Sequence, residues 1–270
     1  MRHSRSLHRE TPWGIHHLVW TGTAADGINW VGYLTTTYND TLVLNYNPAV
    51  YGATIDNDIV ANIPEDLVYQ VEEVFEPNYC GSGSGPNSRN TRTETKTRTR
   101  TGQEWNPDST LFSLWIGIND IYFLSLRPDP YQDMHCAIVR YFELINKLHT
   151  CGARNFLIFN VPPCDRSPHV LAYEPKAREE YNEVTVEYNA QLSNAIDAWS
   201  EDHPDSSVVA YDSWSFFTEV LDHPEVYGFT DGTSIGSGEK YVWWDDFHPT
   251  SAFHRFLAQD VGKFLGWTDE

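Results

Sequence analysis

The chain has 270 residues, enough for one large α/β domain or two small domains. Its 38 acidic residues outnumber its 18 basic residues, so the formal net charge of −20 argues against nucleic acid or an anionic membrane as a partner, because phosphate groups would repel this surface. A hydrophobic fraction of 40% supplies a core, but no run of about 18 apolar residues could span a membrane, and the basic start MRHSRSLHRE does not read as a signal peptide.

Strand-like apolar runs alternate with helix-period runs along the chain, a pattern typical of a parallel sheet with helices on both faces. The predicted strands are residues 41–46 (TLVLNY), 111–117 (LFSLWIG), 156–161 (FLIFNV) and 207–211 (SVVAY). The predicted helices are residues 66–75, 133–148, 176–199 and a last helix after Pro249, for which Thr250 or Ser251 is a suitable N-cap.

One segment breaks this pattern. Residues 81–103, GSGSGPNSRNTRTETKTRTRTGQ, are low in complexity and cannot bury apolar area, so we expect a disordered surface insertion. The insertion does not divide the chain, because strand 111–117 is needed in the same sheet as strand 41–46. We therefore expect a single domain over residues 1–270.

The four cysteines, Cys80, Cys136, Cys151 and Cys164, are far apart and form no CxxC motif. A zinc knuckle or a redox motif is therefore not indicated. One or two disulfides and free buried thiols both remain open.

Parallel strands deliver functional groups at their carboxyl ends, and two of four candidate residues follow such ends. Gly52 lies in a turn after TLVLNY, Asn119 follows LFSLWIG, and Asp245 and His248 precede the last helix. Glycine lets a backbone N–H approach a reacting oxygen, and an asparagine amide is a neutral donor to a developing oxyanion. Histidine carries the proton while aspartate fixes its tautomer, so this set is typical of acyl transfer without its nucleophile.

These residues stand in motifs that resemble the SGNH, or GDSL, hydrolase superfamily, and within it fungal acetylesterases of carbohydrate esterase family 16. The shared blocks are YGAT at 51–54, GIND at 117–120 and DDFH at 245–248, together with NWVGYLTTTYN at 29–39, NVPPCDRSP at 160–168 and WWDDFHPT at 243–250. The resemblance covers about residues 26–265 apart from the insertion.

The resemblance implies a flavodoxin-like three-layer α/β/α fold and hydrolysis of small acyl esters, in particular acetyl groups on carbohydrate. It implies that Gly52 and Asn119 are oxyanion donors, that His248 is the general base and that Asp245 is its partner. It also implies no cofactor, a small acylated carbohydrate as substrate, an extracellular destination and a monomer.

Simpler interpretations of the same residues remain open. Gly52 could be a turn glycine, Asn119 could cap a helix, and His248 could be structural. Asp246 could replace Asp245 as the partner of His248, although its spacing does not fit the family.

The family's opening strand and its Gly-Asp-Ser block are not found. Ser4 and Ser6 are the only serines before Ser82, and neither follows Gly-Asp; Thr21 and Thr23 follow the apolar LVW but do not fit the family pattern. We expect a chain truncated before its serine, with little esterase activity, or else a non-catalytic carbohydrate-binding relative. Without a first strand we also expect unpaired backbone groups and low solubility, unless residues 15–20 (IHHLVW) fill the gap.

Two other classes of function compete. A metal hydrolase could use Asp245, His248 and His254 as ligands, although no HExxH motif supports it. A binding module could stack sugars on the many Trp and Tyr side chains, and composition alone does not decide between core and binding roles.

Overall fold

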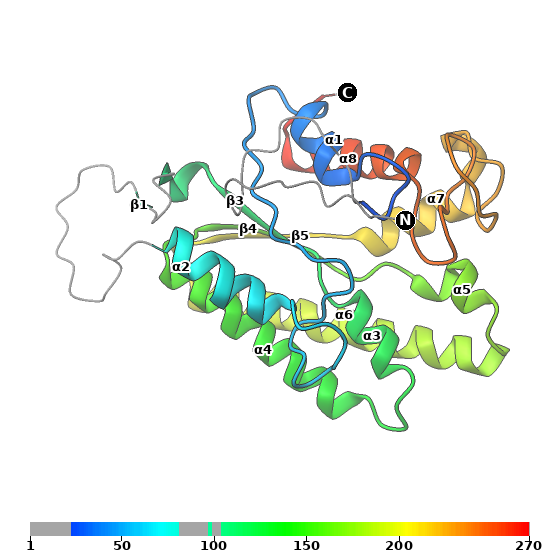
Figure 1. Ribbon diagram of the computed structural model, residues 1–270, viewed down its shortest axis with the longest axis horizontal. Helices are drawn as coiled ribbons and strands as arrows, with labels where there is room; N and C mark the ends of the chain where they lie inside the picture. The colour runs from blue at the N-terminus through cyan, green and yellow to red at the C-terminus, as the bar shows by residue number, and fades with distance from the viewer. Residues whose placement is uncertain (1–22, 81–96, 99–103, 270) are drawn as a thin grey trace, which may run out of the picture.

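The computed structural model describes residues 23–80, 97–98 and 104–269 (Figure 1). Within them, three parallel strands form a sheet in the order β3-β4-β5. Phe156 in the central strand pairs with Phe112 on one side and Val208 on the other. The bounds are β3 Leu111–Leu114, β4 Asn155–Phe159 and β5 Ser207–Tyr211. Three of the four predicted strands are therefore confirmed, and β3 ends three residues earlier than predicted.

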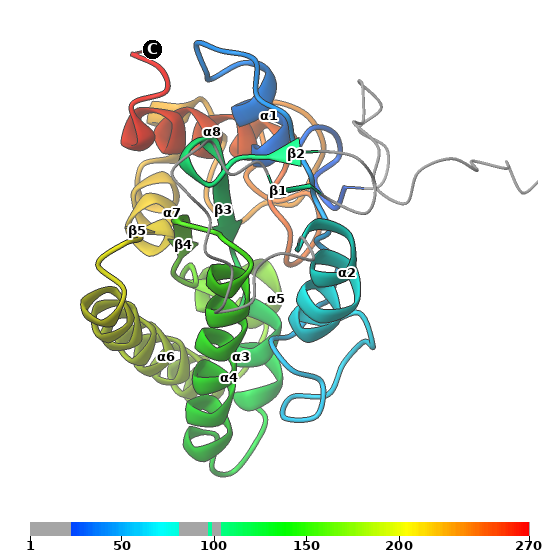
Figure 2. The same cartoon turned by 90° about the vertical axis from the view of Figure 1, so that its left-hand side faces the viewer.

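Helices cover both faces of this sheet, because successive side chains of a buried strand point to opposite sides. In β4, Phe156 and Ile158 join one apolar cluster while Leu157 and Phe159 join the other. The first cluster includes side chains of α3 (Ile118–Leu124), α4 (Tyr131–Thr150) and α6 (Pro175–Asp202). The second includes side chains of α1 (Trp30–Thr36), α7 (Ser213–Asp222) and α8 (Ser251–Leu265). Figures 1 and 2 show these two groups on opposite sides of the strands, which confirms the three-layer α/β/α arrangement.

The predicted helices form, with extended ends. The helix expected over 66–75 contains a π-helical stretch, Tyr69–Phe75, and continues as α2 (Glu76–Tyr79). The helices expected over 133–148 and 176–199 are α4 and α6, each longer than predicted at both ends. The last helix is α8, and the side chain of Thr250 accepts a hydrogen bond from the backbone N–H of Phe253, which confirms the predicted cap.

The prediction of a buried strand over residues 41–46 is wrong. The segment is extended but unpaired, and Leu42 and Leu44 are 90% and 52% exposed. Its backbone groups make no hydrogen bond with other described residues. A strand is stable only beside a partner that satisfies its N–H and C=O groups, and no described strand lies next to this segment.

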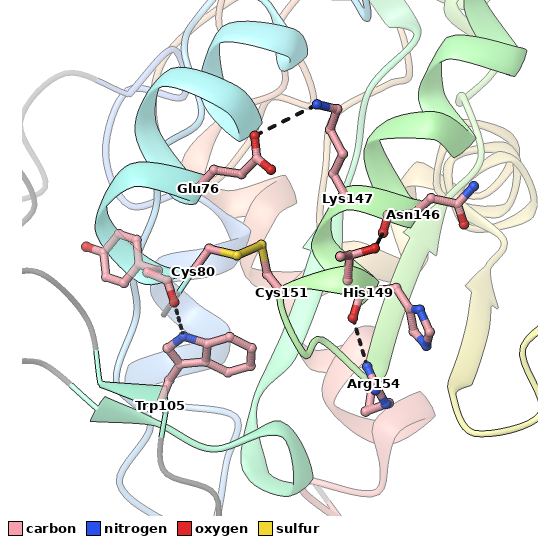
Figure 3. The surroundings of a disulfide bond; sticks show 10 residues. Glu76, Cys80, Trp105, Asn146, Lys147, His149, Cys151 and Arg154 are labelled. Atoms are coloured by element: carbon pink, nitrogen blue, oxygen red, sulfur yellow. Dashed lines mark hydrogen bonds and ion pairs between the residues drawn. A yellow bond between two sulfur atoms is a disulfide. The ribbon is translucent and has the colours of Figure 1, made fainter. Parts of the chain in front are cut away.

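The cysteines resolve into one disulfide and two thiols. Cys80 at the end of α2 is bonded to Cys151 at the end of α4, so the covalent bond joins the carboxyl ends of two neighbouring helices (Figure 3). Trp105 lies beside this bond and donates from its indole Nε1 to the carbonyl of Tyr79. Cys164 is buried and Cys136 is half-buried, and both are free.

Two earlier predictions fall on other parts of the chain. Residues 15–20 lie outside the described ranges, as does most of the 81–103 insertion. Within that insertion, β1 (Thr97–Arg98) pairs antiparallel with β2 (Glu104–Trp105). In the part of the chain that the structure describes, no helix is both long and apolar enough to cross a membrane.

Candidate active site

A cleft opens at the carboxyl ends of the parallel strands, where α/β proteins bind their ligands. Three of the four candidate residues, Gly52, Asn119 and His248, line it. The fourth, Asp245, contacts the cleft residue His248. Segments that lie far apart in the sequence therefore meet at one place, as the strand ends predicted.

The turn before α8 holds Asp245 and His248 together. Asp245 Oδ1 and Oδ2 each lie 2.9 Å from His248 Nδ1. Asp245 Oδ1 also accepts the backbone N–H groups of Phe247 at 2.8 Å and His248 at 2.7 Å. One carboxylate thus fixes both the backbone of the turn and the imidazole, which leaves Nε2 of the ring to act on a substrate or nucleophile.

The pKa of Asp245 follows from these contacts. Partial burial opposes ionisation, but the N–H groups of Phe247 and His248 and the imidazole outweigh it and hold the pKa of this carboxyl below its usual value. Asp245 is therefore an anion at neutral pH, as a partner that stabilises an imidazolium must be.

Gly52 lies between two contacts that tie it to the other candidates. The ring of Tyr51 packs on His248 with 5.2 Å between centroids, and the carbonyl of Ala53 accepts a hydrogen bond of 2.9 Å from Asn119 Nδ2. Gly52 has φ +82°, a conformation that favours glycine. Its N–H donates to no other described residue, so it remains free to bind a ligand oxygen.

Asn119 and its neighbour Asp120 anchor this glycine loop to the start of α3. Asn119 uses one amide hydrogen on Ala53, and the other has no partner among the described residues. The alternative in which Asn119 caps a helix is wrong, because the cap position of α3 belongs to Gly117. Asp120 is fully buried and accepts the N–H of Ile55 at 3.1 and 3.3 Å. Burial raises the pKa of Asp120 to about 7.

Gly117 is required where the chain passes from β3 into α3. Its φ is +113°, and a Cβ there would lie 2.4 Å from the hydroxyl of buried Tyr188. A side chain there would collide with Tyr188 on α6, so either Tyr188 or the start of α3 would have to shift. The glycine of the GIND motif thus sets the position of its asparagine.

With this geometry established, the relatives of the chain can be considered. The sequence model of the GDSL-like Lipase/Acylhydrolase family matches residues 19–261. The chain belongs to this family. Its fold is accordingly the GDSL/SGNH fold, and the family is one of carboxylic ester hydrolases.

Several esterases are similar to the chain. An acetylesterase of Thermothelomyces thermophilus is 30% identical over 241 residues, which cover 88% of this chain and 75% of the relative. Two GDSL esterase/lipases of Arabidopsis thaliana are 26% and 27% identical over 181 and 189 residues. The chain spans about half the length of these plant relatives, with 50% and 52% of them aligned.

The cleft of this GDSL chain holds a second histidine–aspartate pair, which was not predicted from the sequence. Asp246 does not serve His248: its Oδ2 lies 2.8 Å from Nδ1 of His169, which also lines the cleft. The alternative in which Asp246 replaces Asp245 is therefore wrong. The pair spans 77 residues, so no local spacing could have indicated it.

His254 lines the same cleft but lacks the partners of a ligand site. Its Nδ1 is buried with no hydrogen-bond partner among the described residues, and burial together with the nearby His248 lowers its pKa to about 4. The described residues include no group of three or more His, Cys, Asp or Glu side chains that could hold a metal ion. The proposed set of Asp245, His248 and His254 is thus not assembled.

The described wall of the cleft offers no ready nucleophile for a GDSL hydrolase. No serine lines it among residues 23–80 and 104–269. Cys164 lines it, but burial raises the pKa of its thiol far above neutral, so no thiolate forms. Thr23 lines it with its hydroxyl directed to the carbonyl of Gly27. Thr21, Ser4 and Ser6 lie outside the described residues.

Proposed function

We propose that this GDSL family member hydrolyses small acyl esters by a Ser-His-Asp mechanism, with His248 as general base and Asp245 as its partner. The observation that carries the proposal is the position of Gly52, between a residue that packs on His248 and a residue that binds Asn119. A proton acceptor and two neutral donors thereby belong to one cleft.

In this mechanism His248 Nε2 takes the proton of a serine hydroxyl as its oxygen attacks the ester carbonyl. The anion of Asp245 stabilises the imidazolium that forms. The N–H of Gly52 and the free amide hydrogen of Asn119 bind the oxyanion of the tetrahedral intermediate. His248 then protonates the departing alcohol, and the same residues activate water to release the acid from the acyl-enzyme.

The nucleophile in this proposal is a serine that does not belong to the described wall of the cleft. By the family resemblance, it follows a strand and a Gly-Asp pair upstream of residues 29–39. The stretch 41–46 supports the idea, because it pairs with no strand among the described residues and such a segment would provide one.

The substrate class we propose is acetylated carbohydrate outside the cell. A relative covering most of the chain is named an acetylesterase. The net charge of −20 disfavours anionic substrates and is compatible with a neutral sugar ester.

A chimera tests the proposal. The opening segment of the Thermothelomyces acetylesterase is joined to this chain ahead of Thr23, and hydrolysis of 4-nitrophenyl acetate is followed. We expect turnover in the chimera, little turnover in the present sequence alone, and loss of turnover in the chimera with His248→Gln.

Two results would contradict the proposal. One is turnover of the present sequence that a serine-reactive phosphonate abolishes, which would contradict the position proposed for the nucleophile. The other is a chimera whose turnover does not respond to His248→Gln.

A carbohydrate-binding protein without catalysis is the second candidate, favoured by the absence of a serine from the described cleft wall. Saturable binding of an acetylated oligosaccharide without acetate release, in both the present chain and the chimera, would favour it.

A further inference from the structure

The turn that carries Asp245 and His248, here called the catalytic turn, runs from Trp244 to His248. Its apex, Asp246, is bonded to a residue outside the turn. The base of the turn is closed by a hydrogen bond of 2.8 Å from Trp244 N–H to the carbonyl of His248, and its interior is filled by the Asp245 carboxylate. Among the described residues, Asp246 makes no hydrogen bond within the turn. Its carbonyl accepts the N–H of His169 at 2.7 Å, and its carboxylate lies 2.8 Å from His169 Nδ1.

His169 is itself well fixed, so it can act as an anchor. It lies in the first turn of the short helix α5 (Pro168–Leu171), which the buried Ser167 caps through the N–H of Val170. Its second ring nitrogen, Nε2, lies 3.0 Å from the hydroxyl of Tyr173. Both nitrogens of the imidazole are therefore engaged, and the ring cannot turn without breaking one of these bonds.

Aromatic packing joins this anchor to the catalytic ring. Phe247 contacts His169, Tyr122 and His248 edge-on, with centroid distances of 5.7, 6.1 and 6.0 Å. Tyr122 in turn packs on His169 at 5.7 Å. A displacement of Asp246 would also displace Phe247, the next residue in the chain. Because both residues lie between Asp245 and His248, the displacement would change the position of His248 relative to Asp245.

We infer that His169 is a positioning residue that, through Asp246, fixes the turn in which Asp245 orients His248. The catalytic role of the turn rests on the proposed function, but the claim that His169 fixes the turn does not depend on it. Two contacts to one residue, backbone to backbone and side chain to side chain, restrict the apex far more than a single ion pair at an exposed site.

The test is NMR spectroscopy of the full chain, because it needs no turnover. In His169→Leu, we expect the amide hydrogens of Phe247 and His248 to exchange with solvent roughly tenfold faster, since a charge-assisted hydrogen bond that restrains the turn is lost. We also expect the low-field signal of the His248 Nδ1 proton to weaken. Asp246→Ala cuts the same side-chain contact from the other side and should have the same effects.

Rescue and control variants separate positioning from general damage. His169→Asn retains an amide nitrogen near the place of Nδ1 and should restore both signals. His149→Leu removes a matched pair, since His149 Nε2 lies 3.1 Å from Asp205 at the amino end of the sheet, and it should leave both signals unchanged.

The inference is overturned if His169→Leu and Asp246→Ala both leave the turn signals as in the unaltered chain. It is also overturned if His149→Leu changes them equally, or if His169→Asn fails to restore them in a protein whose β4 amides stay protected. Failure of the chimera to hydrolyse esters would refute the proposed function. It would not affect the inference about His169, because the NMR measurements need no turnover.

Discussion

At the scale of single residues, the most consequential group is the buried carboxyl of Asp120. Burial raises its pKa to about 7 from an ordinary value of 3.8, and the nearby Asp66 and Asp56 add to the effect. The folded chain therefore holds this proton more tightly than the unfolded chain. Its contribution to stability is full below pH 4 and is lost as the pH rises through 7.

Asp120→Asn should remove this pH dependence while keeping an oxygen for the N–H of Ile55. Between pH 5 and pH 8, we expect the unaltered chain to lose about 3 kcal/mol of unfolding free energy relative to the variant. Urea denaturation of both proteins at the two pH values measures the difference. Parallel pH profiles would show that Asp120 carries no raised pKa.

Asn119 makes the sharpest catalytic prediction at this scale. Asn119→Ala in the chimera should lower kcat by about 100- to 1000-fold with little change in KM, because the lost donor acts on the oxyanion of the transition state. Steady-state hydrolysis of 4-nitrophenyl acetate gives both constants. Asn78→Ala, on helix α2 and bonded to Val74, serves as the matched control.

At the scale of elements, all four predicted helices form, whereas one of the four predicted strands does not, and the shorter helices α1, α3, α5 and α7 were not predicted. The helices α4 and α6 follow from apolar residues recurring every three or four positions, which is a property of the segment itself. A strand depends on its neighbours. Residues 41–46 have the composition of a buried strand, but they pair with no other described strand, and Leu42 and Leu44 are exposed. The π-helical stretch Tyr69–Phe75 carries no comparable signal.

The cap of α8 makes a prediction about the element that follows the catalytic turn. Thr250 is buried; its hydroxyl accepts the N–H of Phe253 and donates to the carbonyl of Tyr241 at 2.7 Å. Thr250→Ala should cost about 1–2 kcal/mol of unfolding free energy, because both groups lose their partner. Thr250→Ser keeps the hydroxyl and should recover most of it in the same thermal or urea unfolding experiment; equal losses in both would argue against the cap.

At the scale of the whole molecule, the sequence predicted the residues that line the cleft better than the long-range contacts that hold the structure together. Gly52, Asn119 and His248 line one cleft, as predicted. Asn119 follows β3 and His248 precedes α8, so chain order indicates their place, whereas Gly52 follows a segment that forms no strand among the described residues. The bond between His169 and Asp246 joins positions 77 apart, and the pairing of Cys80 with Cys151 was one of several open choices. Such contacts depend on how layers pack, which no local pattern records.

The disulfide makes a prediction at the same scale, because it closes a loop with a sequence separation of 71. The double variant Cys80→Ser, Cys151→Ser should lose about 4 kcal/mol of unfolding free energy through the greater entropy of the unfolded chain. Differential scanning calorimetry measures the change. Cys136→Ser, which removes a free thiol on α4, should leave the transition in place; a shift as large as that of the double variant would contradict the assignment.

The central claim is that His248, Asn119 and Gly52 face a common spot, and titration of the full chain with acetate tests it most directly. We predict that NMR signals of the His248 ring, the Asn119 side-chain amide and the Gly52 backbone amide shift together with a single dissociation constant. A titration in which the His248 signals shift while those of Asn119 and Gly52 stay fixed would contradict the account.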